Sequence, residues 1–270
     1  MQLENILRRL TTRPAQPASP VAEIEPPPLL QCTEHEVERW NGEWLAYLKG
    51  EWPWQLASYT EYPDTPPLPD SPLAMMDLHF GLDWEWNIPW SLYCDREALE
   101  GRRVMEVGCG CGNLGKLLGR YVDLYLGTDY STLALKVARL VSPPNCHYVH
   151  VADQAGLAPY FGTIDTVVGR YFWIHQNLDL GRGTLAFMER FLKPGGRLYA
   201  DFFWPNPDAE QFVVLTPDDS LSETYPSAMF RYSPEDIQRL IEGRPFRILR
   251  EEISRETQRR YVVFERLASR

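Results

Sequence analysis

The stretch Val104-Met105-Glu106-Val107-Gly108-Cys109-Gly110-Cys111-Gly112-Asn113 decides the fold of this chain. Its first residues are apolar around a single acid, and the β-branched Val104 and Val107 are typical of a short buried strand. The three alternating glycines lack a Cβ, so the backbone can turn sharply there and lie close to a ligand. Leucines then recur at helical spacing over residues 114–118. Strand, glycine turn and helix, in this order, form a binding site at the carboxyl edge of a parallel α/β sheet.

The chain beyond this stretch keeps alternating between strand and helix patterns. The helix before the fifth strand stops at Lys193-Pro194-Gly195-Gly196, because proline and glycine do not continue it. Such alternation indicates a parallel sheet with helices on both faces. After the first strand, apolar runs predict strands at 124–128, 147–151, 164–168 and 197–203.

The C-terminal part departs from this alternation. Residues 204–232 form a long insertion punctuated by prolines, and Ser233-Pro234-Glu235-Asp236 then starts a helix that we expect to run to Gly243. Two strand patterns, 246–253 and 260–265, are separated only by a short polar turn, which favours an antiparallel hairpin. The predicted fold class is therefore α/β, with a Rossmann-like mixed sheet of about seven strands that is mostly parallel and ends in an antiparallel hairpin.

The N-terminal part differs in composition and divides the chain into three segments. Residues 1–30 combine an amphipathic start with a proline-rich linker, and whether they are ordered or a targeting segment stays open. Residues 31–99 form an aromatic and helical arm, in which Thr33 with Glu36 is typical of a capping box. Residues 100–270 form the α/β domain, with 204–232 as an insertion on the substrate side.

Tryptophan is concentrated in the arm, since seven of the nine tryptophans precede residue 91. One interpretation is that large rings anchor a segment with little regular structure. The other is a lid over the site, with an aromatic cage for a cationic or flat substrate. Trp84, Trp86 and Trp90 lie nearest the glycine turn in sequence and are the better lid candidates.

Composition narrows the class of partner. The net charge of −10 argues against a nucleic-acid partner, because such affinity depends mainly on Lys and Arg neutralising phosphates. No apolar run approaches the length of a transmembrane helix, so no membrane partner is expected. The five cysteines have no paired spacing beyond Cys109 and Cys111, where a disulfide would distort the glycine turn. They fit a reducing compartment, and we expect a cytoplasmic protein. A homodimer through the N-terminal arm stays open.

Four features now stand in a fixed order. They are Glu106-x-Gly108-x-Gly110-x-Gly112, Asp129 at the end of the next strand, Ala152-Asp153 after the third, and Leu192-Lys193-Pro194-Gly195-Gly196 before the fifth. Together they resemble the class I S-adenosylmethionine-dependent methyltransferases over roughly residues 100–265. The reversed last strand of that family matches the predicted hairpin. The resemblance implies S-adenosyl-L-methionine as cofactor and no metal.

The resemblance also implies roles for individual residues. Asp129 presents a carboxylate to the two ribose hydroxyls, as the equivalent acid does in dinucleotide folds. Asp153 accepts from the adenine amine, Tyr130 packs on the adenine ring, and Glu106 organises the glycine turn. The predicted cofactor-binding residues are Glu106, Gly108, Cys109, Gly110, Gly112, Asp129, Tyr130, Asp153, Gln154 and Arg170.

Methyl transfer to an oxygen or nitrogen needs a base only where the acceptor must lose a proton. The end of the fourth strand is the natural place for one. His175 is the best candidate because its ordinary pKa lies near neutrality, although a His here also occurs without a base role. Tyr171 and Arg170 either orient an acceptor or shape its site. The predicted catalytic residues are His175 and Tyr171.

Other chemistries fit the residues less well. Gly110-x-Gly112-x-x-Gly115 is formally a dinucleotide-binding motif, but it begins deeper in the turn than a nicotinamide dehydrogenase requires. His147 and His150 alternate along one strand without the further ligands that a metal needs. We therefore expect a methyltransferase acting on a small-molecule oxygen, nitrogen or carbon. The alternatives are a peptide or protein methyltransferase, and a catalytically silent subunit that binds the cofactor.

Overall fold

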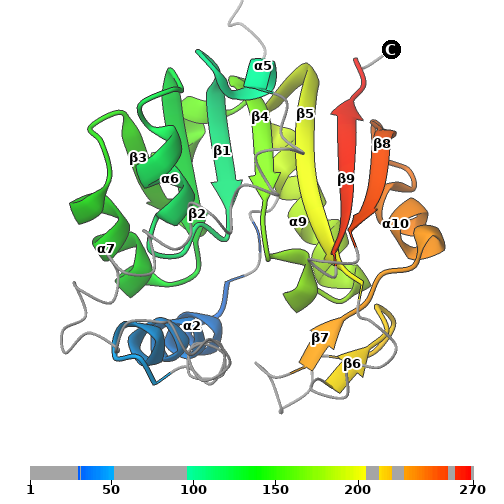
Figure 1. Cartoon of the computed structure of the whole chain (residues 1–270), viewed down its shortest axis with the longest axis horizontal. Coiled ribbons are helices and arrows are strands. Elements are labelled where there is room, and N and C mark those ends of the chain that lie inside the picture. Colours follow the sequence, from blue (N-terminus) through cyan, green and yellow to red (C-terminus); the bar gives the residue numbers. More distant parts are fainter. Residues whose placement is uncertain are drawn as a thin grey trace, which may run out of the picture.

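The computed structural model describes residues 30, 32–51, 96–204, 213–220, 228–254 and 259–268, and the fold is built from these. A 7-stranded sheet has the order β3-β2-β1-β4-β5-β9-β8 (Figure 1). β1 to β5 pair in parallel, while β9 is antiparallel to both β5 and β8. This confirms the predicted mixed sheet and its C-terminal hairpin. The strands are β1 (Arg103–Val107), β2 (Leu124–Asp129), β3 (Cys146–His150), β4 (Ile164–Gly169), β5 (Leu192–Phe203), β8 (Phe246–Ser254) and β9 (Arg259–Arg266).

Helices cover both faces of the sheet. Neighbouring residues of one strand enter different hydrophobic clusters, because side chains alternate across a sheet. Val104 belongs to the cluster that contains Leu135 of α7 (Thr132–Val141), and Met105 belongs to the cluster that contains Met188 of α9 (Leu178–Phe191). None of the described helices is long and apolar enough to cross a membrane. The helices are α2 (Glu34–Leu48), α5 (Arg96–Leu99), α6 (Asn113–Leu118), α7 (Thr132–Val141), α8 (Gln154–Leu157), α9 (Leu178–Phe191) and α10 (Pro234–Ile241), with 3-10 turns η1 (Ala158–Tyr160) and η2 (Trp173–His175).

Side-chain caps fix where the site-bearing helices begin. Ser131 accepts from the backbone N–H of Ala134 and starts α7, while Asn177 accepts from Leu180 and starts α9. Each bond satisfies one of the helix's otherwise unpaired N–H groups. Ser233 and Asp236 form the reciprocal capping box expected for α10. These helix starts are thus determined by residues next to them in the sequence.

Two elements lie beyond the carboxyl edge of the parallel strands. Figure 1 shows α2 below this edge on the side of α7, and β6 (Val213–Leu215) with β7 (Ala228–Phe230) on the side of β9. β6 and β7 pair in parallel as a separate small sheet within the 204–232 insertion. The arm and the insertion therefore flank the edge at which the glycine turn lies.

Several predicted boundaries were wrong by a few residues. The fifth strand begins at Leu192 rather than at 197, because Lys193–Gly196 continues the strand after α9 ends at Phe191. α10 ends at Ile241, before Gly243, and the third strand covers 146–150 rather than 147–151. Thr33 caps α2 by accepting from Glu36 N at 3.2 Å. Trp84, Trp86 and Trp90 lie outside the described residues.

Candidate functional site

The glycine turn after β1 has the backbone shape that its sequence predicts. Gly108, Gly110 and Gly112 have φ values of 73°, 52° and 83°, in the left-handed region that favours glycine. The backbone N–H groups of Gly108 and Cys109 both donate to Thr128 O of β2, at 2.8 and 3.0 Å. These bonds fix the turn on the end of the neighbouring strand.

Asp129 lies directly against this turn. One carboxylate oxygen accepts from Gly110 N at 2.9 Å and the other from Ser131 N at 2.7 Å. Burial raises the pKa of this carboxyl from 3.8 to about 6, and the two backbone donors oppose that rise. A buried carboxylate at the turn has lone pairs left for a ligand's hydroxyl donors.

Glu106 is buried behind the turn in a polar contact network. Its carboxylate accepts a short hydrogen bond from the Tyr125 hydroxyl, and Arg170 Nε lies 3.8 Å from its other oxygen. The Tyr125 side chain is fully buried and its pKa is raised by burial and by Glu106. Arg170 follows β4 directly, so the network joins the carboxyl ends of β1 and β4 to the start of β2.

The residues predicted to hold an adenine ring lie along the ends of β2 and β3. Tyr130 is half-buried, and its backbone oxygen contacts His150 Nε2 at 3.0 Å. Asp153 is exposed and caps α8 by accepting from Gly156 N at 2.9 Å. Gln154 is also exposed. The capping bond uses one oxygen of Asp153, which leaves the other available.

The predicted acceptor-side residues follow β4. Tyr171 has a φ of 51°, which is rare for a residue other than glycine, and its backbone N–H donates to Asp201 Oδ1 at 2.7 Å. Strained backbone of this kind is concentrated at functional sites. His175 ends η2 and is half-buried. Burial lowers its pKa to about 3, with further lowering by the charges of Arg259 and Arg39.

The helix of the arm, α2, reaches both halves of this site. A Cβ on Gly110 would lie 2.3 Å from the Trp44 ring, so the ring packs on the backbone of the turn. Trp40 contacts His175 edge-on, with ring centroids 5.3 Å apart. Asn41 Oδ1 accepts from Ser131 Oγ at 2.8 Å and from Leu133 N at 3.0 Å. α2 is thereby attached to the start of α7, two residues beyond Asp129.

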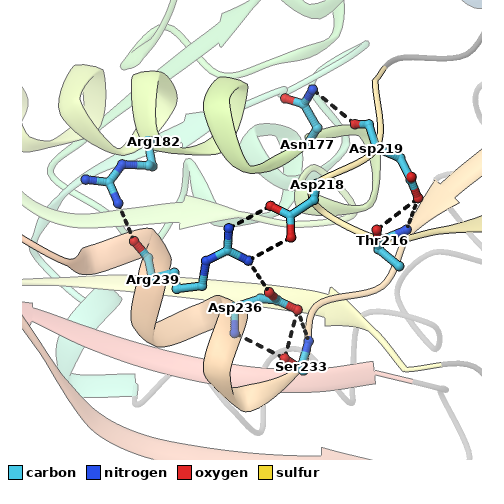
Figure 2. Close-up of polar contacts among 8 residues, drawn as sticks. All are labelled: Asn177, Arg182, Thr216, Asp218, Asp219, Ser233, Asp236 and Arg239. Atoms are coloured by element: carbon cyan, nitrogen blue, oxygen red, sulfur yellow. Dashed lines mark hydrogen bonds and ion pairs between the residues drawn. The ribbon is translucent and has the colours of Figure 1, made fainter.

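The insertion is attached to the other side of the site by a bidentate ion pair. Figure 2 shows the Arg239 guanidinium between Asp218 and Asp236. Arg239 Nη2 and Nη1 donate to the two carboxylate oxygens of Asp218 at 2.6 and 3.0 Å, and Nη1 also donates to Asp236 Oδ1 at 2.9 Å. Asn177, the cap of α9, donates to Asp219 O at 3.3 Å (Figure 2). The loop after β6 is therefore fixed between the start of α9 and the last turn of α10.

The predicted site residues thus come together in two groups at one edge. The turn, Asp129, Glu106 and Arg170 are contiguous, and His175 lies beneath α2. In the part of the chain that the structure describes, no group of His, Cys, Asp and Glu is arranged to hold a metal. Sequence reasoning missed Tyr125, Asn41 and Arg259. The sequence suggested the arm as a lid over the site, and the helical spacing of Trp40 and Trp44 indicated a packed helix, but it did not indicate which residues these rings contact.

A family comparison matches the centre of the chain. Residues 104–196 match the family described as a methyltransferase domain. The matched region begins in β1 and ends in the Lys-Pro-Gly-Gly segment of β5. It therefore contains the glycine turn, Asp129 and the segment up to His175.

Relatives of known activity are similar over comparable stretches. The chain is 27% identical over 157 residues to the tRNA U34 carboxymethyltransferase of Pseudomonas fluorescens (strain Pf0-1), covering 56% of this chain and 48% of that protein. It is 35% identical over 120 residues to the ribosomal RNA small subunit methyltransferase C of Hahella chejuensis, covering 41% and 34%. It is 31% identical over 120 residues to the ubiquinone biosynthesis O-methyltransferase of Paracidovorax citrulli, covering 43% and 49%. The chain spans less than half the length of each of these three relatives.

Two solved structures share the fold. The PH0226 protein from Pyrococcus horikoshii OT3 aligns with a TM-score of 0.54 and 18% identity, over 78% of this chain and 98% of that one. The magnesium protoporphyrin IX methyltransferase from Synechocystis PCC 6803, with bound S-adenosylhomocysteine, aligns with a TM-score of 0.51 and 16% identity, over 79% and 95%. At these identities the likeness concerns the arrangement of strands and helices.

Proposed function

We propose that this protein transfers a methyl group from S-adenosyl-L-methionine to a small-molecule acceptor. Residues 104–196 match the methyltransferase domain family, and the sheet around them has the fold of the class I S-adenosylmethionine-dependent enzymes. The relative that acts in ubiquinone biosynthesis supports a small acceptor. The net charge of −10 supports it too, because an acidic protein repels RNA.

One observation carries the proposal: the buried Asp129 carboxylate is hydrogen-bonded to the backbone of the glycine turn. The ribose hydroxyls of a nucleoside are donors that an ionised carboxylate can accept, and the turn lets the rest of the ligand lie close to backbone. Glu106 and Arg170 form an ion pair behind the turn and support the end of β1, from which the turn begins. The residues present therefore fit an S-adenosyl nucleoside.

A nicotinamide dehydrogenase fits this arrangement less well. The dinucleotide fold has a mostly parallel sheet with the strand order 3-2-1-4-5-6, whereas here the antiparallel β9 is inserted between β5 and β8.

When bound, S-adenosyl-L-methionine supplies an activated methyl group, so the protein mainly has to align the acceptor and exclude water, which contributes about 7–11 kcal/mol in favourable cases. We assign alignment to the residues that follow β4. With a pKa of about 3, His175 is neutral at physiological pH and accepts a hydrogen bond from the acceptor's O–H or N–H. This refines the general base expected from the sequence into an orienting group that takes a proton only as the methyl bond forms.

We assign the exclusion of water to α2, the described part of the arm. Its contacts to the turn, to α7 and to His175 join the cofactor side to the acceptor side. Trp40 and Trp44 take the covering role that the sequence had suggested for later tryptophans. A homodimer through the arm stays a prediction, and α2 packs here on its own chain.

Binding and labelling test the proposal together. Isothermal titration with S-adenosylhomocysteine and with NAD should show heat for the first alone. Methyl-labelled S-adenosyl-L-methionine, incubated with extract of the producing cell, should then yield a labelled metabolite. Binding of NAD without S-adenosylhomocysteine would refute the methyltransferase. Labelled RNA or protein would select the alternative acceptors, and binding without any labelled product would indicate a silent subunit.

A matched pair of variants locates the binding site. Asp129→Asn should weaken S-adenosylhomocysteine binding by about ten- to hundredfold, since a hydrogen bond to a charged group contributes about 1.5–3 kcal/mol. Asp123→Asn changes an exposed acid just before the same strand and should leave the affinity unchanged. Equal affinities for the two variants would remove Asp129 from the cofactor site.

A further inference from the structure

Arg259 is a buried arginine at the acceptor side of the edge. It is the first residue of β9 and pairs with Phe203 at the carboxyl end of β5. Its side chain is only 11% exposed. Because charged side chains are rarely this buried without a partner, its surroundings need an explanation.

The protein satisfies this guanidinium only in part. Asp201 Oδ2 lies 3.6 Å from Arg259 Nε, which is close enough for charge compensation but too long for a hydrogen bond. The guanidinium stacks on the rings of Tyr171 and Phe203, with 4.8 and 5.4 Å to their centroids. Nε and Nη1 are both buried, and neither donates a hydrogen bond to any residue within the described ranges.

Buried N–H groups without an acceptor are costly and rare in folded proteins. A planar guanidinium also presents its N–H groups as a fork that matches a carboxylate or a phosphate. The unused donors of Arg259 therefore indicate an anionic ligand group that completes them.

A second arginine, from another element, acts on the same histidine. Arg39 belongs to α2, and the charges of Arg39 and Arg259 together act on His175. Trp40 of the same helix contacts the His175 ring. The Tyr171 side chain, held by its backbone bond to Asp201, remains 39% exposed beside Arg259. Cationic and aromatic groups thus surround the residue assigned to the acceptor.

We propose that Arg259, assisted by Arg39, binds an anionic group of the methyl acceptor, so that the acceptor is a small aromatic carboxylate or phosphate. This rests on the proposed function for the identity of the site as an acceptor site. The cofactor's own carboxylate is the other source of an anion. However, the guanidinium stacks on Tyr171, which follows β4 on the acceptor side, whereas the glycine turn follows β1. The backbone of β9 itself lies three strands from β1, about 14 Å at the usual strand spacing. The acceptor is therefore the favoured source.

Simple anions test the proposal on the purified full chain. Benzoate, phenyl phosphate and the neutral benzamide are titrated calorimetrically, with and without saturating S-adenosylhomocysteine. We expect at least one of the two anions to bind, and benzamide to bind at least about tenfold more weakly, since charge-assisted hydrogen bonds are lost.

Variants identify the residue responsible. Arg259→Gln should weaken anion binding by about ten- to hundredfold, and Arg259→Lys should retain part of it because the charge remains without the fork. Arg39→Gln should have a smaller effect. Arg247→Gln is the matched control, because Arg247 lies on the adjacent β8 with a side chain that is 60% exposed. Thermal denaturation verifies folding, and Arg259→Lys decides the test if the glutamine variant does not fold.

Several results would overturn the proposal. These are no binding of either anion to the wild-type chain, equal binding of benzamide and the anions, and anion binding unchanged by both Arg259 variants. Weaker S-adenosylhomocysteine binding with unchanged anion binding would assign Arg259 to the cofactor instead. Competition of an RNA oligonucleotide with benzoate at Arg259 would assign the site to nucleic acid. Anion binding that persists while S-adenosylhomocysteine fails to bind would refute the proposed function but keep the anion site.

Discussion

The protonation of Asp129 should control the affinity for the cofactor. Its carboxyl is buried, and its pKa is raised from 3.8 to about 6. Only the ionised form accepts from both the turn and the ribose hydroxyls. Lowering the pH through 6 should therefore protonate the group and weaken cofactor binding.

The magnitude follows from the fraction of ionised carboxylate. At pH 7 about nine-tenths of an acid with this pKa is ionised, and at pH 5 about one-tenth is. Because apparent affinity scales with the binding-competent fraction, the Kd for S-adenosylhomocysteine should rise by about tenfold between pH 7 and pH 5. Isothermal titration at pH 5, 6, 7 and 8 measures this directly.

Asp129→Asn is the control, because its side chain does not titrate. Its Kd for S-adenosylhomocysteine should be higher than that of the wild type at pH 8 and should vary little from pH 8 to pH 5. Any pH dependence that both proteins share belongs to other groups. A wild-type Kd that stays constant from pH 8 to pH 5 would refute the assignment of Asp129 as the ribose acceptor.

The same carboxyl should also lower the stability of the ligand-free protein as the pH rises. The folded pKa is above the unfolded one, so the folded state binds its proton more tightly and loses stability between about pH 4 and pH 6. A rise of about two pKa units corresponds to a loss of about 3 kcal/mol. Urea denaturation across this range should show that the free energy of unfolding of the wild type falls relative to that of Asp129→Asn as the pH rises.

Three further predictions concern the supports of the site. Tyr125→Phe removes the hydroxyl donor of the buried Glu106 and should lower the free energy of unfolding by about 1.5–3 kcal/mol. The control Tyr121→Phe, at an exposed ring, should leave the free energy of unfolding unchanged. Equal denaturation midpoints for the two variants would contradict this prediction. Gly110→Ala should destabilise the fold, because the positive φ disfavours alanine and its Cβ would meet the Trp44 ring. Adding Trp44→Ala should relieve part of this cost, with a coupling of about 0.5–3 kcal/mol in the free energy of unfolding. Strictly additive effects would show that ring and turn are independent. Arg239→Ala should release the loop after β6, so that limited proteolysis cuts within 213–220 faster than in the control Arg244→Ala. High salt should accelerate the same cleavage in the wild type, because it screens the ion pair. An unchanged cleavage rate would mean that the ion pair does not restrain the loop.

The sequence by itself determined the α/β class, the mixed sheet with its antiparallel hairpin, and the meeting of the glycine turn with Asp129, to which we assign the cofactor. These depend on signals that are local in sequence. Three glycines impose positive φ, Asp129 ends an apolar strand, and Ser131 and Ser233 cap the helices that follow. Parallel pairing then brings consecutive strand ends to the same edge, so the turn and Asp129 must meet.

Only the tertiary structure decided what surrounds that half. Tyr125 reaches Glu106 from the adjacent strand, Asn41 attaches α2 to the start of α7 from 90 residues away, and Arg259 meets Asp201 because an antiparallel strand returns beside β5. No periodicity or spacing encodes these contacts, since each depends on how whole elements pack. For the same reason Trp40 and Trp44 had the pattern of an ordinary amphipathic helix until the fold placed that helix over the glycine turn and His175.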